Sequence, residues 1–514
     1  MKFPEDILEE GPIGDAQRSV FEQAIADGTT DPVLCSSLAR QCLENGCPGL
    51  GLWFLGLEIR TSASVNETDL ALIAELIEAL GLAAEEAERE SGTGRLAGFF
   101  AVLDRLPLGC QELCMQGMAV KLASEPEAAA AFVQRYSDVG DLEGSQSFLS
   151  LCMAVHMLGG ELAAAKSVAG LIKAFSHKTR WTHGALARLA ASVGDYEEAE
   201  KQCKTAIEND LGALRIMGFL AAVLYARGKE GEARDALKRS FSRINPEEFA
   251  LRRNEIADWC GQLQEALANR TLDGGELYRI GAAANYTDHE RLLGFWRDHD
   301  KNCGRENTYR TVSAYTNTVM FDALEAVLAE RPGITKIVNY GTLSGVREYE
   351  MAGRLAHAFW GYDVSEEATG LNKERFVRDN LFFSSDFESL LSDMNILPGG
   401  SIMTHCRTMD IMFPEALRNV YRRCRAMNLD FILSAEYLGA SILTLDYPDF
   451  TKETADTVIW EGIVMIHDIP KILKEEGYRV ISTEYRPIPL LVSVGGEGLQ
   501  PCQLIQLVLA ERVE

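Results

Sequence analysis

The pattern of hydrophobic and polar residues changes type near residue 333. Upstream, apolar residues recur mainly at the spacing of amphipathic helices. Downstream, short runs rich in β-branched and aromatic residues alternate with helical segments, as expected of a parallel sheet with helices on both faces. The pattern therefore predicts a multidomain chain, with an all-α amino-terminal region followed by an α/β carboxy-terminal domain.

The helical region contains a repeat of 34 residues between residues 150 and 245. Glycine and alanine each recur in this register, at positions Gly160, Gly194, Gly228, Ala165, Ala199 and Ala233. Glycine suits the turn between two helices, and alanine lets the two helix backbones approach closely. Each repeat is therefore predicted to be a helix, a glycine turn and a second amphipathic helix.

This repeat resembles the tetratricopeptide family in its period, its glycine and its alanine. The large aromatic residue of the first helix and the closing proline of that family are mostly missing. A weaker copy ends at Ala131, and residues 15–120 show helical periodicity without a clear register. The resemblance implies a solenoid whose concave surface binds a protein partner. The alternative is that these helices only build a core.

The repeat pattern stops at residue 245, and turn-rich stretches follow it up to Gly304. Residues 306–330 then form one long predicted helix, which ends before Pro332 and Gly333. The predicted domains are a helical repeat domain over residues 1–245, a helical linker over residues 246–304 and an α/β domain over residues 305–514.

Seven predicted strands alternate with five predicted helices after Gly333. The strands are expected at residues 336–340, 358–362, 381–384, 401–405, 429–434, 478–485 and 502–510. The helices are expected at residues 345–356, 366–378, 387–394, 413–427 and 467–476. This order is typical of a Rossmann-like sheet.

The turn after the first predicted strand carries the strongest chemical signal. Gly341 and Gly345 lie between that strand and a helix, and Asp363 ends the second strand 22 residues after Gly341. Glycine lets the backbone approach a ligand, and a carboxylate at this distance can bind ribose hydroxyls. We interpret the segment as a nucleoside-binding β-α-β unit. A turn glycine before a helix also serves structure alone in many α/β proteins.

Residues 305–514 resemble the class I S-adenosylmethionine-dependent methyltransferases in the strand count, the glycine turn and the acidic residues after the second and third strands. The resemblance implies a seven-stranded sheet with an antiparallel last strand and S-adenosyl-L-methionine as the cofactor. It places the cofactor against Gly341 and Gly345, the ribose hydroxyls at Asp363 and the adenine amino group near Asp386.

Two positions depart from the pattern of that family. Asn339 stands where an acidic residue usually precedes the first glycine by two positions, and Leu343 stands where a middle glycine is common. Asn339 stays among the expected cofactor contacts. Either change would weaken cofactor binding, so a second hypothesis is an adaptor protein whose methyltransferase-like domain has lost catalysis. A nicotinamide-dependent enzyme is a third, which the strand order and the incomplete Gly-x-Gly-x-x-Gly pattern disfavour.

Residues 461–478 resemble the helix that precedes the sixth strand in sugar and small-molecule O-methyltransferases. Gly477 ends this predicted helix, and the strand over residues 478–485 follows it. The resemblance implies that the methyl acceptor is a hydroxyl group of a sugar or of another small molecule.

Methyl transfer to a hydroxyl group needs a base, and ligands of open parallel sheets bind at the carboxyl ends of the strands. His405 ends the fourth predicted strand and is a candidate both for the base and for a cofactor contact. Glu436, after the fifth strand, and His467 are further candidate bases. The competing interpretation is that His405 is a hydrogen-bonded strand-end residue and that His467 only opens its helix.

Arg407 and Asp410 follow His405 closely and are the candidates for orienting the acceptor. The competing interpretation is that Arg407 pairs with a neighbouring carboxylate for structural reasons. The loop after the fourth strand is therefore expected to supply the acceptor side of the site.

Charge and composition narrow the partners. A formal net charge of -26 argues against a broad nucleic-acid or anionic-membrane surface. The chain shows no apolar run of about 18 residues, and its first residues are acidic. Twelve cysteines are spread along the chain without a CxxC pair, so no metal is expected. We expect a cytoplasmic protein with a small-molecule substrate and a protein partner.

Overall fold

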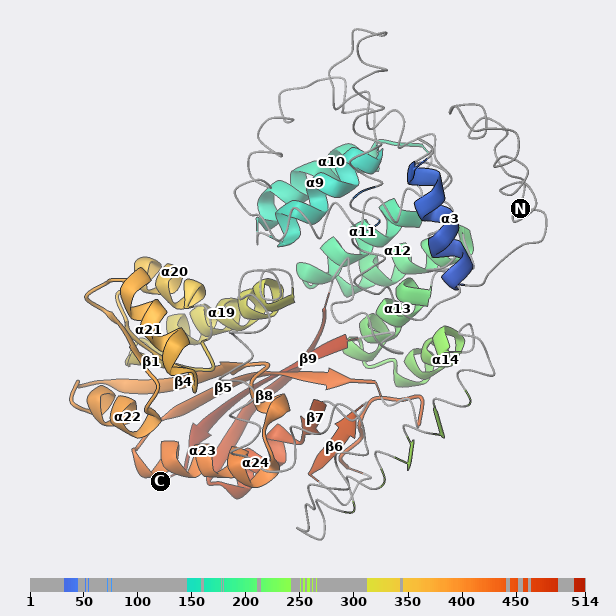
Figure 1. Ribbon diagram of the computed structural model, residues 1–514. Helices are drawn as coiled ribbons and strands as arrows, with labels where there is room; N and C mark the ends of the chain where they lie inside the picture. Colours follow the sequence, from blue (N-terminus) through green and yellow to red (C-terminus); the bar gives the residue numbers. More distant parts are fainter. Residues whose placement is uncertain are drawn as a thin grey trace, which may run out of the picture. The chain divides into compact units, whose positions relative to one another are not determined.

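The computed structural model describes ten main segments of the chain (Figure 1). These are residues 32–44, 146–158, 161–209, 214–241, 312–342, 345–440, 444–451, 456–460, 464–488 and 503–513, without residues 177 and 179 and with a few single positions between 51 and 75 and between 250 and 265. Two compact units divide the chain. The first contains α3 (Pro32–Glu44) and the helices α9 to α12, and the second contains α19 to α24 and the described strands.

Six helices in the region 146–241 form three helix-turn-helix pairs in sequence. They are α9 (Gln146–Leu158), α10 (Leu162–Lys173), α11 (Arg180–Ser192), α12 (Tyr196–Asn209), α13 (Leu214–Ala226) and α14 (Glu230–Phe241). The first helix of each pair begins 34 residues after that of the preceding pair, and the second helices keep the same interval. The period predicted from the sequence is therefore the period of the helices.

The glycines and alanines of the repeat serve the predicted purposes. Gly194 and Gly228 have φ values of 79° and 73°, in the left-handed region that favours glycine, and each lies in the turn inside a pair. The side chains of Ala165, Ala199 and Ala233 are fully buried. Helix α9 packs against α10, and α11 packs against α12. Hence Ala165 and Ala199 are buried in helices that pack closely against their pair partners.

The upstream predictions lie largely outside the described residues. The weaker copy that ends at Ala131, most of residues 15–120, Gly160, and nearly all of the linker 246–304 belong to this part. Within the described residues, no helix is both long enough and apolar enough to span a bilayer.

The second unit contains a seven-stranded sheet in the order β3-β2-β1-β4-β5-β9-β8. The strands are β1 (Ile334–Tyr340), β2 (Ala358–Tyr362), β3 (Leu381–Ser384), β4 (Gly400–Cys406), β5 (Phe431–Gly439), β8 (Tyr478–Pro487) and β9 (Gln503–Arg512). Neighbours among β1 to β5 are parallel, whereas β9 is antiparallel to both β5 and β8. The predicted Rossmann-like sheet with an antiparallel last strand is confirmed.

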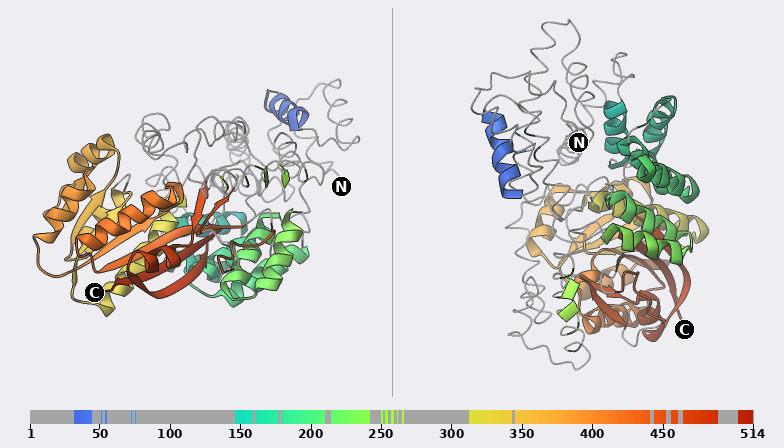
Figure 2. Two further views of the ribbon diagram at one scale, coloured as in Figure 1. Left: turned by 90° about the horizontal axis from the view of Figure 1, so that it is seen from below. Right: turned by 90° about the vertical axis from the view of Figure 1, so that its right-hand side faces the viewer.

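Helices cover both faces of this sheet (Figure 1), and Figure 2 shows the layers from two further sides. One face carries α19 (Val312–Glu330), α20 (Val346–Arg354) and α21 (Glu366–Arg375). The other carries α22 (Phe387–Asn395), α23 (Pro414–Ala426) and α24 (Ile469–Glu475). Parallel strands that are buried on both faces need this double cover.

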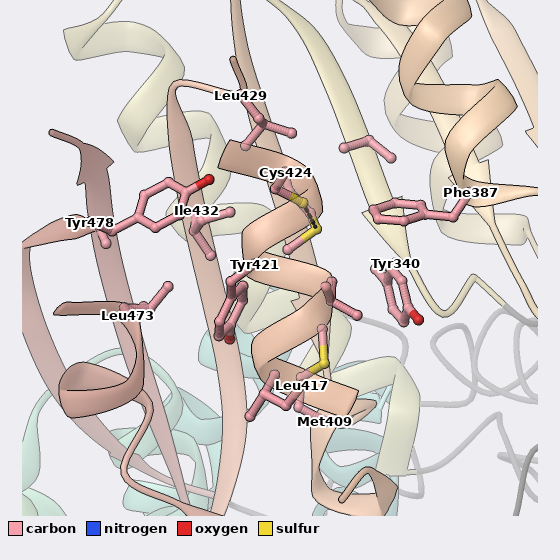
Figure 3. Packing of buried hydrophobic residues seen from close by; sticks show 14 of the residues in the cluster. Tyr340, Phe387, Met409, Leu417, Tyr421, Cys424, Leu429, Ile432, Leu473 and Tyr478 are labelled. Carbon is pink, nitrogen blue, oxygen red and sulfur yellow. Dashed lines mark hydrogen bonds between the residues drawn. The ribbon is translucent and has the colours of Figure 1, made fainter. Parts of the chain in front are cut away.

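The core between the sheet and α22, α23 and α24 is a single apolar cluster (Figure 3). Helix α23 has Pro414 in its first turn and buries Leu417, Tyr421 and Cys424 at the spacing of one helix face. Tyr421 is fully buried and points toward the sheet. This packing fixes α23 against the face of the sheet to which β4 and β5 contribute Met403 and Ile432.

One predicted helix is partly wrong. Residues 464–467 form the strand β7 (Val464–His467), which pairs with β6 (Thr457–Trp460) in an antiparallel hairpin. Helix α24 starts only at Ile469, after the capping residue Asp468, whose side chain accepts a hydrogen bond from the backbone N–H of Lys471. A short apolar run fits a buried strand as well as a helix, and pairing with β6 decides for the strand.

Candidate functional site

The carboxyl ends of β1 to β5 lie at one edge of the sheet, because these neighbouring strands run in the same direction. All residues singled out from the glycine turn to Glu436 lie on or just after these five strands. His467 alone comes from the β6–β7 hairpin. The other residues that the sequence singled out therefore lie at the same edge of the sheet. Their contacts determine what each of them can do.

The glycine loop after β1 lies directly against the end of β2. The backbone N–H groups of Gly341 and Thr342 both donate to the carbonyl oxygen of Tyr362, at 2.8 and 3.0 Å. Tyr362 immediately precedes Asp363. Gly341 has a φ of 87°, which disfavours any residue with a side chain. The glycine turn therefore lies against the residue that precedes Asp363.

Asp363 is a buried carboxylate at the start of a helix. Its Oδ1 accepts a hydrogen bond from the backbone N–H of Ser365 at 2.9 Å. Ser365 is the N-cap of α21, and its hydroxyl oxygen accepts from the N–H of Ala368. The carboxylate is therefore fixed near the positive end of the α21 dipole, where an anion is stabilised.

The second glycine of the loop, Gly345, has a structural reason of its own. It has a φ of 64° and forms the N-cap of α20. A Cβ atom there would lie 2.8 Å from the side chain of Asn372 and 3.0 Å from that of Phe383. Similarly, a Cβ atom on Gly341 would collide with the side chain of Thr408. Both glycines are required by packing, whatever the loop binds.

A buried hydrogen-bond chain crosses from β4 through β1 to α20. The hydroxyl of Thr404 donates to Oδ1 of Asn339 at 2.9 Å, and the Nδ2 of Asn339 donates to Oε1 of Glu348. Burial raises the pKa of Glu348 to about 7, and the charge of Asp363 acts in the same direction. Asn339 therefore connects β4 to a buried carboxyl group on the following helix.

Sequence reasoning missed Glu348, although one signal was present. Glu348 lies three and four residues before Met351 and Ala352, and all three are buried on one face of α20. A charged residue on the apolar face of an amphipathic helix is uncommon. This departure from the helix pattern is the signal that marks Glu348 in the sequence.

Asp386 is exposed and caps α22. Its Oδ1 accepts from the backbone N–H groups of Glu388 and Ser389, both at 3.1 Å, and its Oδ2 accepts from the Ser389 hydroxyl at 2.7 Å. These hydrogen bonds, first the one from the Ser389 side chain, lower the pKa of Asp386. The carboxylate is therefore occupied by capping, next to the carboxyl end of β3.

His405 lies on the sheet face opposite to Thr404, and both nitrogens of its buried ring have hydrogen-bond partners. Its Nδ1 is 2.7 Å from Oε1 of Glu436, and the hydroxyl of Tyr421 is 3.1 Å from its Nε2. These partners fit a tautomer in which Nδ1–H donates to the carboxylate and Tyr421 donates to Nε2. Because both nitrogens are bonded and the ring has no exposed surface, His405 positions Glu436 in this structure.

Glu436 has one oxygen fixed and one oxygen unbonded. Besides His405, the backbone N–H groups of Thr408 and Met409 donate to Oε1, both at 3.3 Å. Its Oε2 is buried and has no hydrogen-bond partner among the residues that the structure describes. A buried carboxylate oxygen without a donor is costly unless something else binds to it.

Asp410 is a second buried carboxyl group beside Glu436. Burial, and then the negative charge of Glu436, raise the pKa of Asp410 to about 7. Arg407 is its nearest described ion partner, with Nε 3.9 Å from Oδ2. Arg407 has a φ of 49°, and its guanidinium lies over the ring of Tyr437 at 5.5 Å. Arg407 and Asp410 therefore lie close together, as a long ion pair.

His467 links the β6–β7 hairpin to the loop after β4. Its Nε2 is 2.9 Å from the carbonyl oxygen of Met409 and 3.0 Å from that of Met412, and its Nδ1 is 2.9 Å from the Thr457 hydroxyl. Burial lowers its pKa, so the ring is neutral at ordinary pH, with Nε2–H as the donor. In these contacts His467 ties two segments together.

Thr408 joins the two sides of the site and was also missed. Its backbone N–H donates to Glu436, while its side chain packs on Gly341. No spacing rule connects a threonine after the fourth strand with a glycine after the first.

Among the described residues, no cluster of His, Cys, Asp and Glu has the geometry of a metal site.

Comparison with models of protein families gives no match, and no curated protein matches the chain. Solved structures do show likeness. One is magnesium protoporphyrin IX methyltransferase of Synechocystis with bound S-adenosylmethionine, at 14% identity and a TM-score of 0.28, covering 43% of this chain and 97% of that one.

Two further solved structures are similar at the same level. The 1,6-didemethyltoxoflavin-N1-methyltransferase of Burkholderia thailandensis matches at 10% identity and a TM-score of 0.29, covering 44% of this chain and 91% of that one. The N-methyltransferase NodS of Bradyrhizobium japonicum matches at 12% identity and a TM-score of 0.27, covering 38% and 87%. At these scores the likeness assigns neither a family nor an activity to this chain.

Proposed function

We propose that this protein is an S-adenosylmethionine-dependent methyltransferase that acts on a hydroxyl group of a small molecule, with sugars as one candidate class. The observation that supports it most directly is the hydrogen bonding of the Gly341 loop to Tyr362, next to Asp363, at the carboxyl edge of the sheet. Ligands of open α/β sheets bind at this edge.

The residues around the glycine loop fit an adenosine group. Asp363 offers a buried carboxylate for the ribose hydroxyls, with one oxygen oriented by Ser365. The hydroxyl of Thr342, inside the loop, is buried and has no hydrogen-bond partner among the described residues. Such a group is expected to bind a ligand or water. Gly341, Gly345 and Asn339 would shape the floor of this site, and Asp386 would border the adenine.

Glu436 is the base that the geometry supports best. When bound, S-adenosylmethionine supplies a methyl group on a sulfonium; the acceptor oxygen bonds to its carbon, and the C–S electron pair stays on sulfur. Glu436 would take the hydroxyl proton on its unbonded Oε2. His405 and Tyr421 would position Glu436 from the other side, so His405 contributes without touching the acceptor.

Asp410 and Arg407 would bind the acceptor beside this base. With a pKa of about 7, Asp410 is partly protonated at neutral pH and can donate a hydrogen bond to an acceptor oxygen. Arg407 is about one-third exposed and reaches the same loop. His467 keeps the loop in place through Met409 and Met412. In this proposal the acceptor lies on the face of β4 that carries His405, and the cofactor lies on the face that carries Thr404.

Calorimetry with S-adenosylmethionine and S-adenosylhomocysteine tests the proposal, with Asp363→Ala as the main variant. We expect the wild-type protein to bind both ligands and D363A to lose at least about 10-fold in affinity, as is typical when a buried charged hydrogen bond is removed. The matched control is Asp393→Ala, an exposed acid on α22, which should bind like the wild type. A folded wild-type protein that binds neither ligand would exclude the proposal.

A second candidate function is an adaptor with a catalytically inactive α/β domain. The packing of Thr408 on Gly341 favours it, because that glycine then has a purely structural reason. The helical pairs α9 to α14, with their 34-residue period, support a tetratricopeptide-like region that binds a protein partner. An adaptor should keep partner binding in D363A, whereas loss of ligand binding in that variant favours the enzyme.

A further inference from the structure

Glu348 is a buried carboxyl group without a compensating cation. Only 3% of the residue is exposed. Among the residues that the structure describes, no Lys, Arg or His forms an ion pair with it. Arg347, its neighbour on α20, pairs instead with Glu350 at 2.7 Å. A carboxylate in such a place costs considerable free energy unless a positive charge arrives.

The surroundings of Glu348 increase this cost. Helix α20 packs against β2 and β3. The charged group that faces Glu348 from the end of β2 is Asp363, which repels its anionic form, and β3 has no titratable residue. Two hydrogen bonds partly stabilise the anion, one from the backbone N–H of Glu348 itself and one from Asn339 of β1. Farther along α20, Arg354 pairs with Glu325 of α19. Every described charge near Glu348 is therefore either an anion or a cation already paired.

Two independent observations make the surroundings of Glu348 a candidate ligand site. The first is its position in the first turn of the helix that begins at Gly345, the end of the glycine loop. The second is the unpartnered, buried hydroxyl of Thr342 in the same loop. A carboxyl group and an unsatisfied hydroxyl at the carboxyl edge of β1 suit a ligand that is both polar and positively charged.

We propose that Glu348 is the carboxyl group that recognises the positive charge of the bound cofactor and that it releases its proton when the cofactor binds. The inference rests on the proposed function, because it takes S-adenosylmethionine as the ligand. Glu348 then supplies the acid that position 339 lacks, and Asn339 holds its Oε1 in place through the bond to Thr404.

The proton balance has a definite sign. With a pKa of about 7, Glu348 is mostly protonated in the free protein at about pH 6 and mostly ionised at about pH 8.5. A cation bound nearby lowers that pKa by direct attraction. Binding at low pH must therefore expel a proton, and the affinity rises up to about 10-fold per pH unit below the pKa of Glu348. The α-amino group of the ligand has an ordinary pKa of about 8, so the contribution of Glu348 is measured below that pH.

Titration calorimetry in two buffers of different ionisation enthalpy, phosphate and Tris, measures the protons released on S-adenosylmethionine binding. We expect up to about one proton at about pH 6 and a smaller release as the pH rises to about 7. In Glu348→Gln this release should disappear, and the affinity should become nearly independent of pH between about pH 5.5 and about pH 7. The matched control is Glu374→Gln, an exposed acid on α21, which should release protons like the wild type.

The outcomes separate the two proposals. Binding without proton release in the wild-type protein, or equal release by E348Q, overturns the role of Glu348 and leaves the proposed function intact. Absence of S-adenosylmethionine binding at every pH overturns both. If E348Q does not fold, absence of proton release from the wild-type protein still overturns the inference.

Discussion

Two polar clusters flank β4, and they differ in how completely their hydrogen bonds are satisfied. On one face, Thr404, Asn339 and Glu348 form a closed chain. On the other face, His405 and Tyr421 fix one oxygen of Glu436 and leave its Oε2 without a partner among the described residues. The closed chain is suited to recognising charge, and the open carboxylate is suited to taking a proton.

The two clusters lie on opposite faces because Thr404 and His405 are adjacent residues of one strand. Side chains alternate between the two faces along a strand. Thr404 therefore meets Asn339 in the layer below α20, while His405 meets Tyr421 of α23. Thr408, which packs on Gly341 and donates to Glu436, is the link between them. Breaking either cluster separately is the sharpest way to test this division.

The largest effect is expected from Glu436→Gln. If Glu436 is the base, kcat for methyl transfer to a panel of small hydroxylated acceptors should fall by about 100-fold to about 10,000-fold. The affinity for S-adenosylmethionine should stay within about 2-fold, because Glu348, which we propose as the cofactor contact, lies on the other face. Glu484→Gln, an exposed acid on β8, is the control with normal kcat. A normal rate in E436Q would remove Glu436 from the mechanism.

The raised pKa of Asp410 should make the free energy of unfolding depend strongly on pH. Its folded-state pKa, about 7, exceeds the ordinary value, so between about pH 4 and about pH 7 the folded state keeps a proton that the unfolded state loses. Stability therefore falls as pH rises through this window and is level above it. Across this window, this single group lowers the free energy of unfolding by on the order of 4 kcal/mol. Glu348 acts with the same sign.

Urea unfolding at a series of pH values measures this contribution. Asp410→Asn carries no titrating group and should show a clearly flatter dependence between about pH 4 and about pH 7. Asp393→Asn, at an exposed position of α22, should keep the wild-type slope. An unchanged slope in D410N would show that Asp410 is ionised in the folded protein.

A smaller effect is expected where the two clusters are linked. Gly341→Ala forces a side chain into a φ of 87° and against Thr408, and should cost about 1 to 3 kcal/mol of unfolding free energy. Gly370→Ala is the control, because a Cβ atom there meets nothing within 4 Å and alanine favours the helix. Adding Thr408→Gly to G341A should recover part of the loss. Additive effects would show that Thr408 does not press on the loop.

The sequence predicted the elements of the α/β domain well and the partners of its side chains only partly. Strands β2 and β3 begin and end at the predicted residues, and the meeting of Gly341 with the residue before Asp363 was expected from the β-α-β spacing. The hairpin of β6 and β7 was missed, because a short apolar run does not reveal whether a partner strand exists. The roles of the candidate site residues remain predictions.

The sequence by itself determined the periods of this protein: the 34-residue helical repeat and the alternation of strand and helix after Gly333. These depend on neighbours a few residues apart, so local spacing encodes them. Only the tertiary structure decided that Asn339 meets Thr404, 65 residues away, and that His405 meets Glu436, 31 residues away. Such contacts depend on strand order and register, which local spacing does not contain.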